Sequence, residues 1–231
     1  MAEKLIEKKT ESAESLAGRA ADQVMAGEYK KALEYCDRAL KIDPNHLGAL
    51  MNRGGALQCL GEFEEAARSY GKAISIKPSI ELWMNKGFAL SKMEKYGDAA
   101  ACFDEVLKLD PKYVDAWRWK GDIMVTQGDC SGAIAFYDKA LEIEPKNEFA
   151  VGNKIVALFR QGKLQEALGC NEKALDADPN DLMALSRKVA LLQKMNRKGE
   201  AEACRKKFEE AQKKQCEECG TAVFIRQRPA S

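Results

Sequence analysis

Proline recurs in this chain at an almost constant interval. Five of the six prolines lie at positions 44, 78, 111, 145 and 179, so successive prolines are 34, 33, 34 and 34 residues apart. A period this regular indicates one structural unit copied along the chain, and stacked copies bury a shared core. The repeat therefore decides the expected fold before any local propensity is considered.

Alignment of the copies on their prolines shows two amphipathic stretches in each unit. Apolar residues recur at spacings of three and four in both stretches, which is the period of an α-helix. Between the two stretches of four units lies a turn glycine: Gly27, Gly61, Gly128 and Gly162. Within the second stretch an alanine recurs at one position: Ala32, Ala66, Ala99, Ala133, Ala167 and Ala201. Glycine ends the first helix without a Cβ clash, and proline cannot continue the second. The pattern predicts an all-α chain.

Two copies carry a recognisable signature. Residues 83–90 read Trp-Met-Asn-Lys-Gly-Phe-Ala-Leu, and residues 117–124 read Trp-Arg-Trp-Lys-Gly-Asp-Ile-Met. Followed by Tyr or Phe before an alanine and by a terminal Asp-Pro, this pattern resembles the tetratricopeptide repeat. The Asn-Lys-Gly-x-Ala-Leu sequence is similar to that of prokaryotic, including archaeal, members. The resemblance implies a right-handed superhelical solenoid of helix–turn–helix units, whose first helices line a concave groove.

We expect three segments along the chain. Residues 1–12 extend the first helix or fray, residues 13–214 form the solenoid, and residues 215–231 form a tail. The solenoid is expected to hold five full repeats and a degenerate capping repeat, at 13–46, 47–79, 80–113, 114–147, 148–181 and 182–214.

The last two repeats depart from the pattern. The fifth has Ile155 and Asn171 where the pattern has glycine and an aromatic residue, so we expect its packing to be looser. The sixth has Lys198, Arg205 and Glu209 where its neighbours have apolar residues. A helix that is apolar on one side only suits the open end of a solenoid, so residues 200–214 are predicted to be a capping helix.

Charge and cysteine usage narrow the class of protein. The net charge of +1 gives no electrostatic argument for nucleic-acid binding. The charged first ten residues do not resemble a signal peptide, and no apolar run is long enough for a membrane span. Most of the eight cysteines lie inside predicted helices and show no disulfide framework. We therefore expect a reducing, cytoplasmic location.

The resemblance places residues of the first helices in the groove. Asn52, Asn85 and Asn153 share one position there and resemble an asparagine ladder that holds an extended peptide backbone. A carboxamide both donates and accepts hydrogen bonds, although asparagine is also simply a soluble residue on an exposed helix. Surplus aromatic residues favour an apolar anchor from a partner. The predicted partner-binding set is Asn52, Asn85, Phe88, Arg118, Trp119, Asn153, Phe159 and Arg187.

Two charge patterns bear on the partner. Family members that clamp the C-terminal carboxylate of a chaperone use lysine, asparagine and arginine, whereas the corresponding positions here are Ala17, Ala21, Asn52, Glu81 and Asn85. The clamp is therefore not expected. A second column is basic throughout and consists of Arg19, Arg53, Lys86, Lys120, Lys154 and Lys188. These cations either recognise an acidic ligand or cover the helix seam beside acidic neighbours.

Cys216 and Cys219 follow the last predicted helix with the spacing of half a zinc ribbon. Three interpretations stay open: zinc shared between two chains, a redox dithiol, or two inert cysteines. The single histidine, His46, has no predicted nucleophile beside it, and no glycine-rich loop is present, so we expect no enzyme and no resident cofactor. The favoured function is a scaffold that binds a peptide or protein segment in the groove. The alternative is a metal-linked or redox-responsive assembly module, which could be a homodimer.

Overall fold

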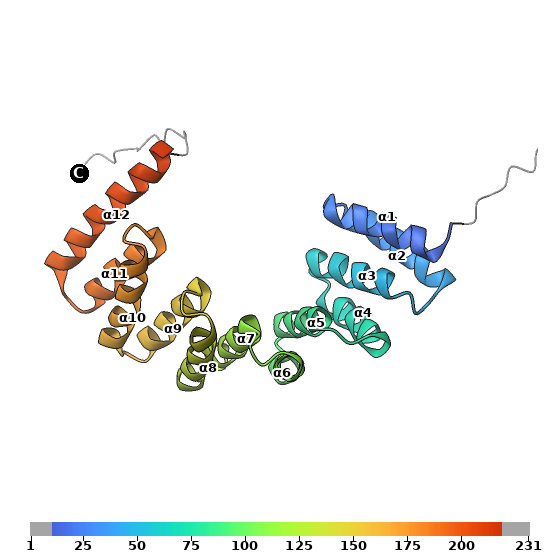
Figure 1. The fold of residues 1–231 in the computed structure, drawn as a ribbon, viewed down its shortest axis with the longest axis horizontal. Helices are drawn as coiled ribbons and strands as arrows, with labels where there is room; N and C mark the ends of the chain where they lie inside the picture. Colours follow the sequence, from blue (N-terminus) through green and yellow to red (C-terminus); the bar gives the residue numbers. More distant parts are fainter. Residues whose placement is uncertain (1–10, 219–231) are drawn as a thin grey trace, which may run out of the picture. The chain divides into compact units, whose positions relative to one another are not determined.

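The computed structural model describes residues 11–218, which contain twelve α-helices and no strand (Figure 1). Each odd-numbered first helix is followed by an even-numbered second helix. The bounds are α1 Ala13–Met25, α2 Tyr29–Ile42, α3 Leu47–Leu60, α4 Phe63–Ile76, α5 Ile80–Lys92, α6 Tyr96–Leu109, α7 Val114–Thr126, α8 Cys130–Ile143, α9 Glu148–Arg160, α10 Leu164–Ala177, α11 Leu182–Lys194 and α12 Lys198–Glu218. The predicted all-α repeat fold is confirmed.

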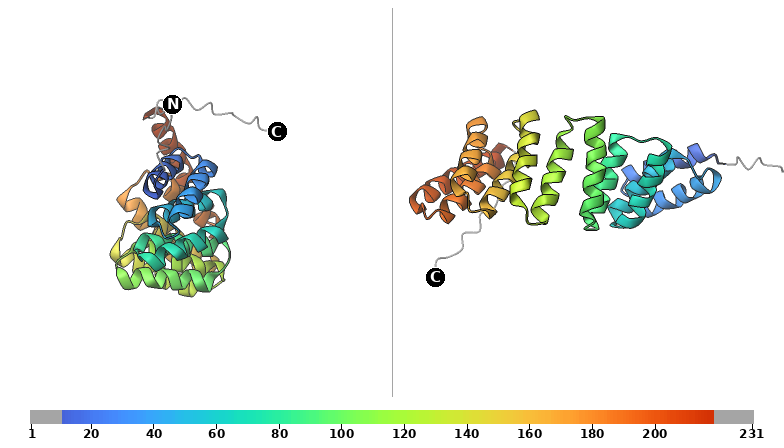
Figure 2. Two further views of the ribbon diagram at one scale, coloured as in Figure 1. Left: turned by 90° about the vertical axis from the view of Figure 1, so that its right-hand side faces the viewer. Right: turned by 90° about the horizontal axis from the view of Figure 1, so that it is seen from below.

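The chain divides into two compact units inside α7. Unit 1 ends at Ile123 and unit 2 begins at Met124. Within each unit, consecutive helices pack side by side, for example α3 with α4 and α11 with α12 (Figure 2). Each unit also has buried apolar clusters of its own, one of which contains Phe103 in unit 1 and another Leu192 in unit 2.

The turn glycines adopt the backbone conformation that the sequence predicts. The φ angles are 75° at Gly27, 81° at Gly61, 86° at Gly128 and 75° at Gly162. Two turns between paired helices have no glycine, and there Glu94 and Asn196 take the left-handed conformation, with φ of 59° and 60°. The short polar side chain of asparagine tolerates this conformation better than a long side chain does, so Glu94 is the more strained of the two.

The alanine column lies where paired helices approach each other. Its members in the five full repeats have no exposed surface, and Ala201 is 3% exposed. A residue with a single methyl group lets the backbones of two helices come close, and any larger side chain would overpack this contact. The column therefore fixes how each second helix packs.

In unit 1, glycines on first helices make room for aromatic rings on second helices. A Cβ atom at Gly54 would lie 2.5 Å from Cε1 of Tyr70, and one at Gly87 would lie 2.7 Å from Cε1 of Phe103. Both rings are buried, with exposures of 2% and 0%. Each ring therefore occupies the space that a side chain on the glycine would need.

At the equivalent positions of α9 and α10 in unit 2, the larger side chain is on the first helix and the smaller one is on the second. Ile155 takes the glycine position on α9 and is 3% exposed, and Asn171 takes the aromatic position on α10 and is fully buried. Nδ2 of Asn171 donates a hydrogen bond to the backbone carbonyl of Ala184 at 2.8 Å. A large residue on the first helix is thus combined with a smaller one on the second.

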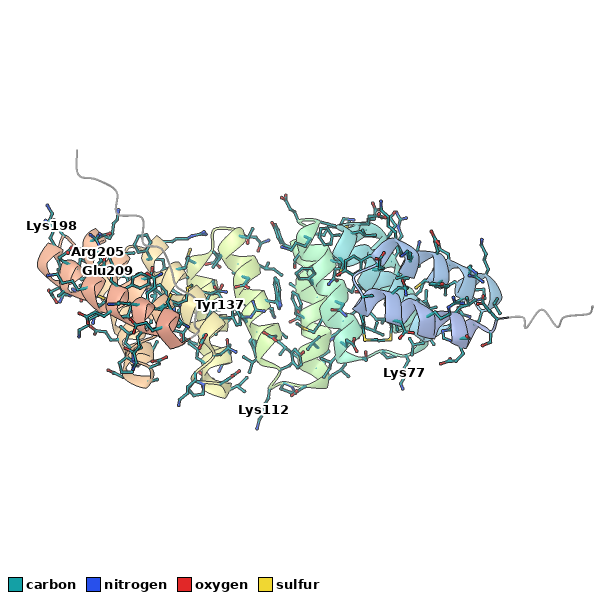
Figure 3. The ribbon with its side chains drawn as sticks, turned by 90° about the horizontal axis from the view of Figure 1, so that it is seen from above. Lys77, Lys112, Tyr137, Lys198, Arg205 and Glu209 are labelled. Atoms are coloured by element: carbon teal, nitrogen blue, oxygen red, sulfur yellow. The ribbon has the colours of Figure 1, made fainter. Side chains whose placement is uncertain are left out.

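The last helix has one buried side. Ala201, Cys204 and Ala211 of α12 are at most 8% exposed. Lys198, Arg205 and Glu209 are exposed along the same helix, as its predicted capping role requires (Figure 3).

The expected end of this helix at residue 214 was wrong, because α12 continues to Glu218. No glycine or proline lies between Glu200 and Glu218, and Nζ of Lys213 lies 3.9 Å from Oε1 of Glu217, one helical turn away. Both features favour continued helix. Cys216 is therefore a helix residue rather than part of a segment after the last helix.

Candidate functional site

The predicted partner-binding residues all lie on first helices. They are Asn52 of α3, Asn85 and Phe88 of α5 and Arg118 and Trp119 of α7 in unit 1, and Asn153 and Phe159 of α9 and Arg187 of α11 in unit 2. Each unit thus holds part of the predicted set, and the surroundings of the two parts differ.

The three asparagines are half-buried. Nδ2 of Asn52 donates a hydrogen bond to the backbone carbonyl of Ala17 at 3.0 Å, which ties α3 to α1. One N–H of this amide therefore already serves helix packing. The asparagine ladder remains a prediction. At Asn52, a bound peptide would have to use the second N–H and the oxygen of the carboxamide.

Aromatic residues form a continuous row in unit 1. The ring of Phe88 packs edge-on against Phe63 at 6.3 Å and against Trp119 at 5.4 Å between centroids. Trp119 also stacks on the buried Phe103 at 6.1 Å. The bulk of Trp119 is thus explained in part by packing against the unit 1 core, and its remaining half-exposed surface joins that of Phe88.

Cations lie over the faces of this aromatic row. The guanidinium carbon of Arg118 is 4.8 Å from the Trp119 centroid, and Nζ of Lys92 is 5.3 Å from that of Phe88. Arg118 also donates to Asp115 at 3.1 Å and to Asp122 at 2.8 Å, and its side chain is 15% exposed. Its charge is therefore compensated inside unit 1, which leaves Lys92 as the more accessible cation.

Unit 2 exposes more apolar surface on its first helices. On α9, Phe149, Val156 and Phe159 are 72%, 44% and 39% exposed, and Met183 of α11 is 69% exposed. Of these, the predicted set contained only Phe159. Met183 occupies the same position of its helix as Phe149, and that shared position was the signal that could have identified it.

Arg187 is held by its own helix and its neighbour. Nε donates to the carbonyl of Met183 at 3.2 Å, and Nη2 lies 3.9 Å from Oδ2 of Asp181. The guanidinium also lies against α9, since a Cβ at Gly152 would be 2.5 Å from Nη1 of Arg187. Gly152 therefore makes space for this arginine, and the side chain bridges α9 and α11.

The basic column lies on the helix seam. Four of its members bind a carboxylate on the preceding second helix, sixteen residues earlier: Arg53 with Asp37 at 3.1 Å, Lys120 with Asp104 at 2.5 Å, Lys154 with Asp138 at 2.5 Å and Lys188 with Glu172 at 2.9 Å. For these four, the interpretation as seam cations beside acidic neighbours is confirmed, and their charges need no acidic ligand.

In unit 1, Arg19 of α1 pairs with Glu11 instead, and Lys86 has no such acidic partner within residues 11–218. The residue at the acidic position of α4 is Gly71, and a Cβ there would lie 3.9 Å from Nζ of Lys86. Nζ is instead 5.5 Å from the centroid of the Trp83 ring. The replacement of an acid by glycine therefore breaks the regular series of ion pairs at one seam.

A pocket of about 650 Å³ lies beside the basic column in unit 2. Leu141, Val151 and Ala174 contribute its apolar wall, and the Lys154–Asp138 ion pair lies at its edge. The equivalent pocket of unit 1, beside Arg53, measures about 320 Å³. Both carboxylates and basic side chains line the larger pocket, in nearly equal numbers, so its charge favours neither an anionic nor a cationic ligand.

The single histidine has a structural role. Nδ1 of His46 accepts a hydrogen bond from the N–H of Ala49 at 3.2 Å, which caps α3, and Nε2 lies 3.0 Å from Oε2 of Glu14. A histidine used in this way is held against two helices. This arrangement offers no activated nucleophile.

Several cysteines behave as small apolar residues. Burial raises the pKa of Cys36 to about 12 and the pKa of Cys102 to about 11. Both thiols are therefore protonated at neutral pH and poorly nucleophilic. The seven cysteines within the described residues are all free thiols.

The predicted Cys216–Cys219 site lies only partly within the described residues. Cys216 is half-buried on α12, and Cys219 lies outside them. Between residues 11 and 218, no group of three or more histidine, cysteine, aspartate or glutamate side chains is placed to hold a metal ion. Zinc binding by this pair stays a prediction. No helix in this part of the chain is long and apolar enough to cross a membrane.

Comparison with known proteins identifies the repeat. Family models described as tetratricopeptide repeat match residues 13–46, 47–80, 85–148 and 124–185. Tetratricopeptide repeat-containing protein trd-1 of Caenorhabditis elegans is 26% identical over 96 residues, which are 41% of this chain and 12% of that protein. The Hsp70-Hsp90 organising protein of Plasmodium falciparum is 35% identical over 86 residues, 37% of this chain and 34% of that protein. The matches thus span about a third or less of these relatives.

Solved structures agree on the fold. A tetratricopeptide repeat protein from Parabacteroides merdae has a TM-score of 0.72 at 21% identity, and covers 84% of this chain and 78% of its own. YrrB, described as a TPR protein with an unusual peptide-binding site, has a TM-score of 0.64 at 24% identity, and covers 79% of this chain and 95% of its own. At these identities the likeness shows the fold alone.

Proposed function

The chain belongs to the tetratricopeptide repeat family, and we propose that it is a non-enzymatic scaffold that binds a segment of another protein on its first helices. Proteins of this family generally mediate protein–protein interaction. The finer statement, that a peptide or protein segment lies along the exposed faces of the odd-numbered helices, is our proposal.

One observation carries the proposal. In the described part of unit 2, the exposed large apolar residues all lie on first helices: Phe149, Val156, Phe159 and Met183. Exposed apolar residues that gather on one set of helices favour an interaction surface, whereas scattered ones need no explanation. In unit 1, the half-exposed edge of the row formed by Phe88 and Trp119 lies on first helices as well.

The relatives do not narrow the partner to a chaperone. The name of the Plasmodium falciparum protein refers to Hsp70 and Hsp90, but the positions expected to clamp a chaperone carboxylate hold Ala17, Ala21 and Glu81 here. Asn52, which does fit the clamp, donates to Ala17 within the protein. A carboxylate would meet no cation at these positions and one like charge, so we propose a different class of partner.

We also propose a cytoplasmic location and no role in nucleic-acid binding. The free thiols of the described cysteines suit a reducing compartment. The net charge of +1 supplies no general attraction to a phosphate backbone.

The proposal is tested with an array of random twelve-residue peptides probed with the full chain. Replacing Val156 and Phe159 together by serine should lower the retained signal about tenfold, because two apolar side chains lose contact with the peptides. Both residues are 39% exposed or more, so circular dichroism should show unchanged helicity.

Leu109→Ser provides the matched control. Leu109 is 57% exposed, but it ends the second helix α6. Its replacement should leave peptide binding unchanged. An equal loss for both variants would indicate non-specific adhesion, and a chain that retains no peptide above background would contradict the proposal.

A further inference from the structure

The exposed faces of α9 and α11 combine apolar and basic residues. We call this surface the α9–α11 face: Phe149, Asn153, Val156, Phe159 and Arg160 of α9, and Met183, Arg187, Ala190 and Lys194 of α11. The residues recur at spacings of three, four and seven within each helix and so share one side of it. The buried residues Leu158 of α9 and Leu192 of α11 point to the opposite side of each helix.

The charge of the α9–α11 face is of one sign. Its ionisable members are Arg160, Arg187 and Lys194. Arg187 pairs with Asp181, but the ion pairs found between residues 11 and 218 include neither Arg160 nor Lys194. Arg160 has one weak contact, from Nη1 to the carbonyl of Val125 at 3.5 Å. The C-terminal ends of both helices therefore present exposed, uncompensated positive charge.

Acidic residues lie at the opposite ends of the two helices. Glu148 is in the first turn of α9, and Asp181 caps α11 by accepting hydrogen bonds from Met183 and Ala184. Along the two helices, the surface thus changes from acidic N-terminal ends outside the α9–α11 face, through the apolar side chains of the face, to its basic C-terminal ends. Such an arrangement gives a bound segment a direction as well as a charge preference.

Unit 1 does not have this combination. The corresponding positions of α5 and α7 hold Glu81, Asp115 and Asp122 against Lys92, and both aspartates are bound by Arg118, which lies next to these positions. The same surface of unit 1 is therefore slightly acidic. A partner that distinguishes the two units can do so by charge alone.

We propose that the α9–α11 face binds a segment of another protein in which large apolar side chains are followed by carboxylates. The apolar side chains would cover Val156, Phe159 and Met183, and the carboxylates would lie near Arg160 and Lys194. This inference rests on the proposed function and names the chemistry of the partner. The chain's own residues 219–231 are a poorer match, because they contain Arg226 and Arg228 and no aspartate or glutamate.

The test uses three labelled synthetic peptides and the full chain. All share one apolar segment of two leucines and a phenylalanine, which is followed by three glutamates, three glutamines or three lysines. Fluorescence anisotropy should show about fivefold tighter binding of the glutamate peptide than of the glutamine peptide, and the weakest binding for the lysine peptide. The preference should shrink as salt is raised from about 50 to about 500 mM.

Arg160→Gln with Lys194→Gln should remove the preference for glutamate and leave the glutamine peptide bound as before. Arg160→Lys with Lys194→Arg keeps both charges and should keep the preference, which separates loss of charge from loss of folding. Lys41→Gln is the matched control, since Lys41 is an exposed lysine in the last turn of the second helix α2, away from the first helices. It should have no effect.

Equal binding of the three peptides would overturn the inference, as would an equal loss for Lys41→Gln. A large gain in binding when Val223, Phe224 and Ile225 are replaced by serine would assign the face to the chain's own tail instead. If the random peptide array gives binding without an acidic preference, the scaffold function stands and the inference fails. If no peptide binds at all, both fail.

Discussion

The two units solve the same packing problem with opposite pairs of residues. In unit 1, the first helix supplies glycine and the second an aromatic ring, as in Gly54 with Tyr70 and Gly87 with Phe103. In unit 2, Ile155 and Asn171 exchange the large and the small partner. The comparison shows that a large and a small side chain can fill the space between paired helices whichever helix supplies the large one.

The exchange of the large and the small residue changes which hydrogen bonds the second helix can form. Asn171 uses its amide to bind the carbonyl of Ala184 in α11, a contact that no ring carbon could make. Its Oδ1 atom has no hydrogen-bond partner and is fully buried. Unit 2 therefore gains a polar link to the next helix and leaves one acceptor unsatisfied, which is unfavourable in a buried site.

The largest expected effect comes from moving the unit 2 pair into unit 1. Gly54→Ile should destabilise the protein by about 3 kcal/mol, because its side chain meets the Tyr70 ring. The double variant Gly54→Ile with Tyr70→Asn should be at least about 1.5 kcal/mol more stable than the sum of the two single effects predicts, because both side chains occupy the same space. Urea denaturation of the two single variants and the double variant measures this coupling.

The control for this cycle lies one residue away. A Cβ at Gly55 would lie 4.0 Å from the Tyr70 hydroxyl and meet nothing closer, so Gly55→Ala should raise stability by up to about 1 kcal/mol through helix propensity. Gly54→Ala should instead lower it. Strictly additive effects in the cycle would show that the volumes of the two positions are independent, and the comparison would lose its basis.

Helix caps should contribute equally in the two units. Asn147 accepts from the N–H of Ala150 at 2.9 Å to cap α9, as His46 does from Ala49 for α3. Asn147→Ala and His46→Ala should each cost about 1 kcal/mol in thermal unfolding. His46→Asn should stay close to wild type. If it loses as much as His46→Ala, the contact of His46 with Glu14 is the important one and the capping role is secondary.

The turns without glycine should respond unequally. Glu94→Gly in unit 1 should raise stability by about 1 kcal/mol, because glycine adopts a φ of 59° without a Cβ clash. Asn196→Gly in unit 2 should gain less than about 0.5 kcal/mol, since asparagine already tolerates this conformation. Denaturant midpoints of the two variants give the comparison. A larger gain at Asn196 would reverse the assigned order of strain.

The smallest effect concerns the broken seam of unit 1. Gly71→Asp should give Lys86 the carboxylate that Lys154 has in unit 2, and it should exceed Gly71→Ala in stability by about 0.5 kcal/mol at low salt. The difference should fall as salt is raised, because the pair is partly exposed. An advantage that is unaffected by salt would have another cause.

Much of the fold could be predicted from the period of the prolines. That spacing, with its glycine and alanine columns, predicted the paired helices, the left-handed turns and the burial of Ala99 and its equivalents. The length of α12 was underestimated, although no glycine or proline interrupts the chain between Glu200 and Glu218. The division of the chain inside α7 has no counterpart in the repeat pattern.

The candidate site was less predictable. The sequence placed its residues on the correct helices, but the partners of their side chains depend on which neighbouring groups lie within reach. The hydrogen bond from Asn52 to the Ala17 carbonyl and the stacking of Trp119 on Phe103 both use residues from other parts of unit 1. The alignment of the repeats shows which residue types recur at a position, but it cannot show a contact that occurs in one repeat alone.

The seam cations have a consequence for how unfolding can spread. In a repeat protein, stability is approximately a sum of terms within each repeat and coupling terms between neighbours. The pairs Arg53–Asp37, Lys154–Asp138 and Lys188–Glu172 each join a first helix to the preceding second helix, so part of the coupling there is ionic and weakens with salt. At Lys86 and Gly71 that part is missing. The coupling between α4 and α5 is therefore expected to be the least sensitive to salt in unit 1. As ionic strength rises, the coupling free energies at the other boundaries should fall toward the value at α4 and α5. Partial unfolding should then stop with more equal frequency at each boundary.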